Sequence, residues 1–350
     1  MIILGIESSC DDTSLALVKD DKTMIAMQTL SQLKHQDFGG VVPEIAARAH
    51  LEALPYLFDA LLKKADLTIN QIDAVAATIG PGLIGGLIVG AHFGRALALA
   101  CDIPFIPINH LEGHALSPRL AASIPFPYLL LLVSGGHCQI LSVNGVADYT
   151  LYGATRDDAI GECFDKCAKM MGLPFPGGPH IEKLAAGCTN PIAARTHYPL
   201  PIPFAGEAHG DFSLSGLKSA VKRVIDQFPS GDIPQKSASD LAFSLQATIA
   251  DLIVDRLQFV LPRFKTAHPT ASHLVVAGGV AANQFIRTAL ETLAHQHHLS
   301  FSAPPLSLCT DNGAMIAWAG HEYHQAGLAL TPDLPCRPRW PLADMKAFIN

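Results

Sequence analysis

The chain opens with three short runs of apolar residues that are typical of β-strands. These runs cover residues 2–6, 13–18 and 23–30, and polar or turn-forming residues separate them. Runs of this length that are rich in Ile, Leu, Val and Thr favour strands over helices. The sequence therefore predicts a three-stranded meander at the start of the chain.

The same order of segments returns near residue 128. A continuously apolar strand is predicted for Tyr128–Val133, a turn for Ser134–Gly136, a returning strand for His137–Val143 and a third strand for Ala147–Tyr152. The two halves share this order of elements rather than their residue identities. The pattern indicates an internal repeat of topology.

Each predicted meander is followed by a helix, a buried strand that ends in glycine, and a second helix. The first half places these segments at 44–64, 74–79 and 83–100, and the second at 157–171, 274–277 and from Gly279 to about His295. Two such β-β-β-α-β-α units facing each other across a central cleft resemble the actin, Hsp70 and sugar-kinase (ASKHA) superfold, in which ribonuclease-H-like domains are duplicated. We therefore expect a two-lobed α/β protein, although a fold alone gives no reaction.

The expected division places residues 1–124 in an N-terminal lobe and residues 125–350 in a C-terminal lobe, whose last helix could pack back on the first. Residues 190–240 contain many prolines and are predicted to be irregular, apart from a short helix at 217–228. The tail from Thr331 is also rich in proline. We expect it to pack as an extended strap.

Composition and charge restrict the class of protein. Of the 350 residues, 49% are apolar and 16% are charged, which suits large cores and excludes a disordered or coiled-coil chain. The 24 Lys and Arg against 31 Asp and Glu give a net charge of −7. No global positive field would attract nucleic acid or an anionic membrane, so contact with nucleic acid must use a local patch or a partner.

Several features predict a cytoplasmic protein with reduced thiols. The eight cysteines are scattered without a Cys-x-x-Cys motif, and the chain starts without the pattern of a signal peptide. The longest apolar stretch, 83–100, contains glycines, His92 and Arg95. This composition favours a buried helix over a membrane span.

Two histidines in the segment His110-Leu-Glu-Gly-His114 form a candidate metal site. Residues four apart share one face of a helix, so both imidazoles can reach one cation. Glu112 is roughly 200° around such a helix, which disfavours a metallopeptidase because that chemistry needs its base beside the metal. Two histidines four residues apart on a helix more often lie on its surface than bind a metal. The position after the predicted strand 105–109 favours the site.

Asp311 is the candidate for a third, oxygen ligand. It opens a predicted helix, so a helix N-cap is the alternative explanation. Two imidazoles and a carboxylate with open positions suit a divalent transition metal such as iron or zinc. Cys163 and Cys167 are also four apart, but their apolar neighbours indicate a core face.

Three glycine-containing turns could bind an anion through backbone N–H groups. They are residues 133–137, 177–179 and 278–283. The alternatives are an ordinary hairpin, a helix C-cap and close helix–strand packing, in that order. Asp11 and Asp12, in the first hairpin turn, could contact a metal or phosphate or simply face solvent.

Taken together, these motifs resemble the TsaD family of tRNA N6-adenosine threonylcarbamoyltransferases over essentially the whole chain. Each motif is weak alone, but the ordered set is highly specific. Two departures are visible, because Asp12 stands where the family usually has Glu, and Ser14 where a smaller residue is common. The matching segments are 5–11, 110–114, 132–137, 161–169, 176–179, 212–218, 278–283, 311–314 and 338–341.

The resemblance implies the site residues and the reaction. His110, His114 and Asp311 would hold one divalent metal per subunit, usually assigned as Fe²⁺, with Zn²⁺ the alternative. The reaction would move threonylcarbamoyl from threonylcarbamoyl-AMP to N6 of the adenosine beside the anticodon (A37) of tRNAs reading ANN codons, giving t6A and AMP. The expected partners are TsaB-like and TsaE-like subunits. The donor would contact Leu132, Val133, Ser134, Gly135, Gly136, Asp165, Gly178, Glu182 and Asn283.

Alternative functions remain at this stage, and no catalytic base is assigned. A kinase or ATPase of the same superfold would use an acidic magnesium site and leaves the His-His-Asp set unexplained. A metallopeptidase is disfavoured by Glu112, and a non-catalytic scaffold by the three candidate ligands. Lys218, Lys222 and Arg223 form the densest basic cluster, but a solvated helix face explains them better.

Overall fold

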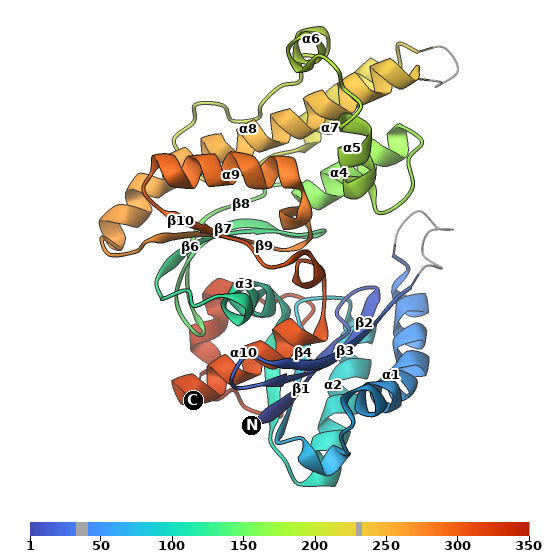
Figure 1. The fold of residues 1–350 in the computed structure, drawn as a ribbon, viewed down its shortest axis with the longest axis vertical. Coiled ribbons are helices and arrows are strands. Elements are labelled where there is room, and N and C mark those ends of the chain that lie inside the picture. Colours follow the sequence, from blue (N-terminus) through green and yellow to red (C-terminus); the bar gives the residue numbers. More distant parts are fainter. Residues whose placement is uncertain (33–40, 229–232, 350) are drawn as a thin grey trace. The chain divides into compact units, whose positions relative to one another are not determined.

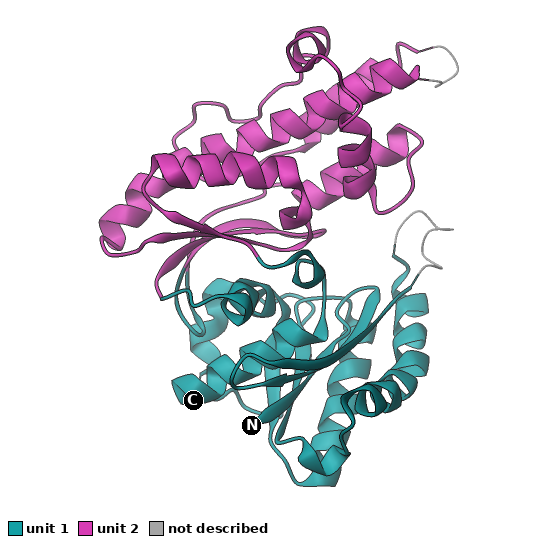
Figure 2. Ribbon diagram, in the orientation of Figure 1, with its two compact units in different colours: residues 1–125, 143–149, 304–350 teal, residues 126–142, 150–303 magenta. Residues whose placement is uncertain are grey.

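The computed structural model describes residues 1–32, 41–228 and 233–349 (Figure 1). The chain forms two compact units, which Figure 2 shows in different colours. Unit 1 comprises Met1–Pro125, Val143–Tyr149 and Pro304–Asn350, and unit 2 comprises Phe126–Ser142 and Thr150–Ala303.

Unit 1 is built on a five-stranded sheet of order β3-β2-β1-β4-β5. Strand β2 pairs antiparallel with both β1 and β3, so the predicted meander at the start of the chain is confirmed. Strand β1 also pairs parallel with β4. The strands are β1 (Ile2–Glu7), β2 (Asp12–Lys19), β3 (Met24–Ser31), β4 (Ala74–Gly80) and β5 (Phe105–Asn109).

Helices cover both faces of this sheet, and two neighbouring residues of β1 show how. Gly5 lies against α10 (Gly313–Ala326), where an added Cβ would be 2.0 Å from the Gly313 carbonyl oxygen. Ile6 points to the other face and contacts glycines of α2 (Ile84–Cys101). Helix α1 (Pro43–Ala65) packs on α2, and α3 (His110–Ala121) packs on α10.

The C-terminal segment packs back on unit 1, as the last helix was expected to be able to do, although its residues were placed in the lobe 125–350. Residues 304–350, including Asp311, belong to unit 1 because α10 packs on β1, β2 and α3. The tail beyond α10 runs along unit 1, where the Arg337 N–H donates to the Ile79 carbonyl and the Asn109 side chain donates to the Trp340 carbonyl. It also contains the 3₁₀ helix η6 (Leu342–Phe348), so it is not extended throughout.

Unit 2 repeats the topology of unit 1. Its sheet has the order β10-β9-β6-β7-β8, so the three-strand segment and the two later strands occupy the same positions as in unit 1. This repeat was predicted from the sequence. The strands are β6 (Tyr128–Val133), β7 (Cys138–Gly145), β8 (Asp148–Ala154), β9 (His273–Ala277) and β10 (Ser300–Ser302).

The helices of unit 2 are more numerous than the sequence predicted. The region 190–240 contains α6, α7 and the start of α8 rather than one short helix, and its residues 229–232 lie outside the described part. Helix α8 has 33 residues and packs on α5, α6 and α9. The helices are α4 (Ile160–Met170), α5 (Gly177–Ala185), α6 (Pro191–His197), α7 (Ser215–Ile225), α8 (Gln235–Ala267) and α9 (Gln284–Gln296).

Among the described residues, α2 is the helix that is long and apolar enough to cross a membrane by length and composition. It packs against β4 and α1 within unit 1. Core helices pass the same test, so a single helix of this kind is weak evidence for a membrane span.

Candidate metal centre and glycine turns

Helix α3 presents both candidate histidines at the end of β5. Asn109 is its N-cap, since the side-chain oxygen accepts hydrogen bonds from the N–H groups of Leu111 at 2.9 Å and Glu112 at 3.4 Å. This cap fixes where the helix begins. His110 is then the first helical residue and His114 follows one turn later on the same face.

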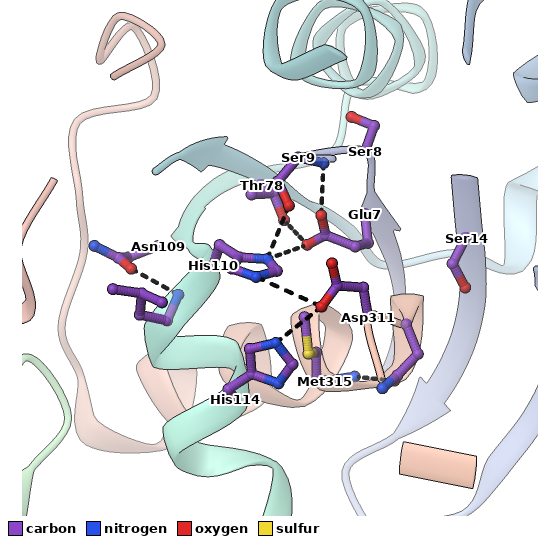
Figure 3. Close-up of polar contacts among 12 residues, drawn as sticks. Glu7, Ser8, Ser9, Ser14, Thr78, Asn109, His110, His114, Asp311 and Met315 are labelled. Carbon is purple, nitrogen blue, oxygen red and sulfur yellow. Dashed lines mark hydrogen bonds and ion pairs between the residues drawn. The ribbon is translucent and has the colours of Figure 1, made fainter. Parts of the chain in front are cut away.

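Asp311 lies beside both imidazoles (Figure 3). Its Oδ1 is 2.9 Å from Nε2 of His114 and 3.6 Å from Nε2 of His110. The two histidines are buried, and the Asp311 side chain is 23% exposed. One ligand atom from each of the three residues lies within 4.8 Å of the others. The structure therefore brings the predicted set together, within unit 1 rather than from two lobes.

The alternative explanation of Asp311 as a helix N-cap is wrong. The N-cap of α10 is Asn312, whose side-chain oxygen accepts a hydrogen bond from the Met315 N–H at 2.9 Å. Because Asn312 performs this role, the Asp311 carboxylate can face the histidines.

Glu7, which no sequence motif singled out as a site residue, contacts His110 at the ring nitrogen that faces away from Asp311. Its buried carboxylate accepts hydrogen bonds from Nδ1 of His110 at 3.0 Å and from the Thr78 hydroxyl at 2.5 Å (Figure 3). The Ser9 N–H donates to its other oxygen at 2.7 Å. With Nδ1 donating to Glu7, Nε2 of His110 is left to face Asp311. The sequence does contain a signal for Glu7, because it is an acidic residue at the end of an otherwise apolar strand.

The buried charges at this centre influence one another. Burial alone would lower the pKa of His110, but the carboxylates of Glu7 and Asp311 outweigh it and raise that pKa to about 9. Burial would raise the pKa of Glu7, and His110 outweighs this effect so that the Glu7 pKa is lowered. The two carboxylates therefore favour positive charge at this centre.

The residues present fit a divalent transition metal. Two imidazole nitrogens and one carboxylate oxygen converge, and the Glu7–His110 contact is the usual support of a metal-bound histidine. The Nε2 of His114 faces Asp311, whereas its buried Nδ1 has no hydrogen-bond partner among the described residues, so this ring lacks the support that Glu7 gives His110. The donor set suits iron and zinc alike.

Glu112 is on the opposite face of α3, as predicted. Its carboxylate accepts hydrogen bonds from the hydroxyls of Tyr149 and Tyr323 and from the Ala147 N–H. The structure therefore places no glutamate of the His-Leu-Glu-Gly-His segment where a metallopeptidase needs its base.

Two of the three predicted glycine turns, 133–137 and 278–283, lie together at one end of the sheet of unit 2. After β6, the Ser134 N–H donates to the His137 carbonyl at 2.8 Å and closes a turn. A Cβ on Gly161 of α4 would be 2.7 Å from the carbonyl oxygen of Ser134, and one on Gly278 would be 2.4 Å from the carbonyl oxygen of Val133. The starts of α4 and of the 3₁₀ helix η4 (Gly279–Ala282) therefore lie against the turn after β6.

The polar residues predicted around these turns already have protein partners. Asp165 accepts from the Gly177 N–H at 2.6 Å, and Glu182 accepts from the Gln284 N–H at 2.7 Å. Asn283 caps α9 through the Ile286 N–H and donates to Gln246. These contacts hold α4, α5, α8 and α9 together at this end of the sheet.

Other predicted residues divide into backbone and core roles. Leu132 and Val133 are fully buried, so only their main chain is available to a ligand. A Cβ on Gly135, Gly136 or Gly178 would meet no atom within 4 Å, so packing does not require glycine there. The remaining positions are structural: Cys163 and Cys167 are buried in the core, Lys218 pairs with Asp158, and Lys222 pairs with Asp226.

Known sequences and structures resemble this chain. The TsaD family model, described as tRNA N6-adenosine threonylcarbamoyltransferase, matches residues 23–318. The chain is 50% identical to the proteins of that name from Brucella canis and Brucella ovis, over 99% of its own length and 97% of theirs.

Two solved structures agree in fold at low sequence identity. HypF from T. kodakarensis has a TM-score of 0.60 and 13% identity, covering 93% of this chain and 48% of that one. The activator of 2-hydroxyisocaproyl-CoA dehydratase from Clostridium difficile has a TM-score of 0.52 and 14% identity, covering 93% and 97%. These likenesses confirm the predicted actin, Hsp70 and sugar-kinase type of α/β fold.

Proposed function

Because the chain belongs to the TsaD family of tRNA N6-adenosine threonylcarbamoyltransferases, we propose that it moves threonylcarbamoyl from threonylcarbamoyl-AMP to N6 of A37 in tRNAs that read ANN codons. The products are t6A and AMP. The match to relatives over 99% of the chain carries this proposal. The convergence of His110, His114 and Asp311 supports it.

The chemistry explains why such a site needs a charged group. The exocyclic amine of adenine is a poor nucleophile, so the carbonyl that it attacks needs a good leaving group and polarisation. A divalent metal held by His110, His114 and Asp311, proposed as Fe²⁺ with Zn²⁺ as the alternative, would polarise that carbonyl as a Lewis acid. Glu7 orients the His110 ring for this role.

The glycine turns of unit 2 are proposed to hold the adenylate. At Gly135, Gly136 and Gly178 an added Cβ would meet open space, so a phosphate or ribose can approach the main chain closely. Backbone N–H groups there would stabilise charge that develops on the leaving AMP phosphate. The main chain of 132–134 and the side chains of Asp165, Glu182 and Asn283 complete the proposed contacts. We assign no catalytic base.

The net charge of −7 argues that tRNA binding needs partners. We propose that TsaB-like and TsaE-like subunits share the tRNA surface and that the complex works in the cytoplasm. Tight, salt-sensitive tRNA binding by this chain alone would contradict the shared surface. Filter binding with and without the partners, over a range of salt concentrations, measures this directly.

Reconstitution with purified threonylcarbamoyl-AMP, partners and a tRNA transcript tests the reaction. We expect t6A in digested tRNA from the native chain, and none from a transcript with guanosine at position 37. His110→Ala and Asp311→Ala should abolish transfer, whereas the exposed His324→Ala on α10 should retain it. ATP turnover without transfer, unchanged in His110→Ala, would instead favour a kinase or ATPase.

A further inference from the structure

The buried carboxylate of Glu112 has no place in the reaction described above. It lies between the two candidate ligands in sequence but faces away from them, and its side chain is completely buried. An unpaired carboxylate at such a position would be strongly unfavourable. Its partners therefore indicate why a carboxylate is there.

Three donors satisfy Glu112, and they come from two other elements. Oε1 accepts from the Ala147 N–H and the Tyr149 hydroxyl, each at 2.8 Å. Ala147 lies between β7 and β8 and Tyr149 near the start of β8, and both belong to unit 1. Oε2 accepts from the Tyr323 hydroxyl at 2.7 Å. Tyr323 is on α10, the helix that begins just after Asp311.

The contact with Tyr323 is part of a close interface between α3 and α10. A Cβ on Gly113 would be 2.8 Å from the side chain of Ile316, so the two helices pack too closely to admit a side chain at this position. Further along, Arg119 donates from Nε to Glu322 at 2.8 Å. The histidine ligands of the proposed metal therefore lie on α3, and Asp311 lies in the segment that leads into α10, the helix that α3 packs against.

We infer that Glu112 is a positioning residue that holds α3 in register against α10, so that His110 and His114 face Asp311. A small rotation of α3 would move both imidazoles away from the carboxylate together, because they share one face of the helix. This inference rests on the proposed metal centre. Its test therefore measures metal binding directly rather than transfer activity.

Tyr323→Phe and Tyr149→Phe form a matched pair. Each removes one hydroxyl from Glu112, so each should lower the free energy of unfolding by a similar amount. Only Tyr323 links Glu112 to α10. We expect Tyr323→Phe to raise the dissociation constant for Co²⁺ about tenfold, and Tyr149→Phe to raise it less than about twofold.

The metal-free chain is titrated with Co²⁺ alone, and visible absorption monitors binding. Competition with a chelator then gives the dissociation constant. A changed spectrum of the bound Co²⁺ in Tyr323→Phe would report altered coordination, which loss of stability alone would not produce. Equal dissociation constants for the two variants, or a native value in Tyr323→Phe, would overturn the inference alone. A native chain that binds no Co²⁺ would overturn the metal centre and this inference together.

Two substitutions of Glu112 distinguish the effect of its hydrogen bonds, which position α3, from the effect of its negative charge. In Glu112→Gln the amide oxygen can still accept from Ala147 and Tyr149, and the amide NH₂ can donate to the Tyr323 oxygen. We expect its Co²⁺ dissociation constant to stay within about threefold of the native value, whereas Glu112→Leu should raise it more than tenfold. Equal losses in both would show that the charge, not the position of α3, matters.

Discussion

The carboxylate of Glu7 and the imidazole of His110 form a buried hydrogen bond of 3.0 Å that links β1 to α3. Since Nδ1 donates to Glu7, Nε2 is the nitrogen available to the proposed metal, which would displace the proton from it. We expect Glu7→Ala to raise the dissociation constant for Zn²⁺ or Fe²⁺ by about 10–100-fold. Competition with a chelator, under anaerobic conditions for Fe²⁺, measures this change.

The control for Glu7 is Glu52→Ala, which removes an exposed carboxylate from α1 and should leave metal affinity unchanged. Glu7→Gln is the second comparison. If its amide NH₂ donates to Nδ1, the proton of His110 moves to Nε2 and metal binding weakens. Native affinity in Glu7→Ala would remove Glu7 from the site.

Ser14, one of the two departures from the family pattern, supports the segment that carries Asp311. Its hydroxyl oxygen accepts a hydrogen bond from the Gly313 N–H at 2.9 Å. Ser14→Ala leaves this buried N–H unpaired, so we expect the free energy of unfolding to fall by about 1–3 kcal/mol. Chemical denaturation measures the loss. Thr29→Val, which removes only the exposed partner of the Ser14 hydroxyl, should cost less than about 1 kcal/mol.

The order of elements could be predicted because the two halves show clear periodicities. The apolar runs at 2–6 and 128–133 became β1 and β6, and the repeat of topology followed from them. Helix α8 was missed for a physical reason: from residue 239 to 261 it is buried on nearly all sides. Its buried polar residues Ser244, Gln246 and Thr248 interrupt the apolar pattern, so periodicity gives only a weak signal there.

The metal centre was predictable only in part. Spacing in α3 gives a shared face for His110 and His114, but nothing local shows that α10 returns to the first sheet. The sequence allows the last helix to pack back on the first lobe but does not require it, so Asp311 is expected from the C-terminal lobe. The choice between Asp311 and Asn312 as the N-cap likewise depends on tertiary contacts, because both residue types cap helices well.

Asp12 should make stability depend on pH. Burial raises the pKa of Asp12 to about 6 from an ordinary value of 3.8, although the Ser31 hydroxyl donates to it. The folded chain therefore binds this proton more tightly than the unfolded chain, and stability falls as pH rises from about 4 to about 6. Asp12→Asn should be more stable than the native chain above that range, by about 1–3 kcal/mol.

Urea unfolding of metal-free protein between pH 4 and pH 7.5 checks the Asp12 prediction. The difference between Asp12→Asn and the native chain should grow with pH and then level off. Asp226→Asn, at an exposed residue of unit 2, is the control and should show no such growth. A constant difference for Asp12→Asn would mean that this carboxyl titrates normally in the folded state.

Substitution by alanine should affect stability at Gly278 and donor binding at Gly136. At Gly278, φ is +93° and a Cβ would be 2.4 Å from the Val133 oxygen, so Gly278→Ala should lower the free energy of unfolding by more than about 2 kcal/mol. At Gly136 a Cβ meets no atom within 4 Å, so Gly136→Ala should leave stability nearly unchanged. If the adenylate approaches this turn, Gly136→Ala should instead raise the KM for the donor about tenfold, equivalent to roughly 1.4 kcal/mol. Steady-state transfer kinetics and thermal unfolding of the two variants decide this, because an unchanged KM in Gly136→Ala would place the donor elsewhere.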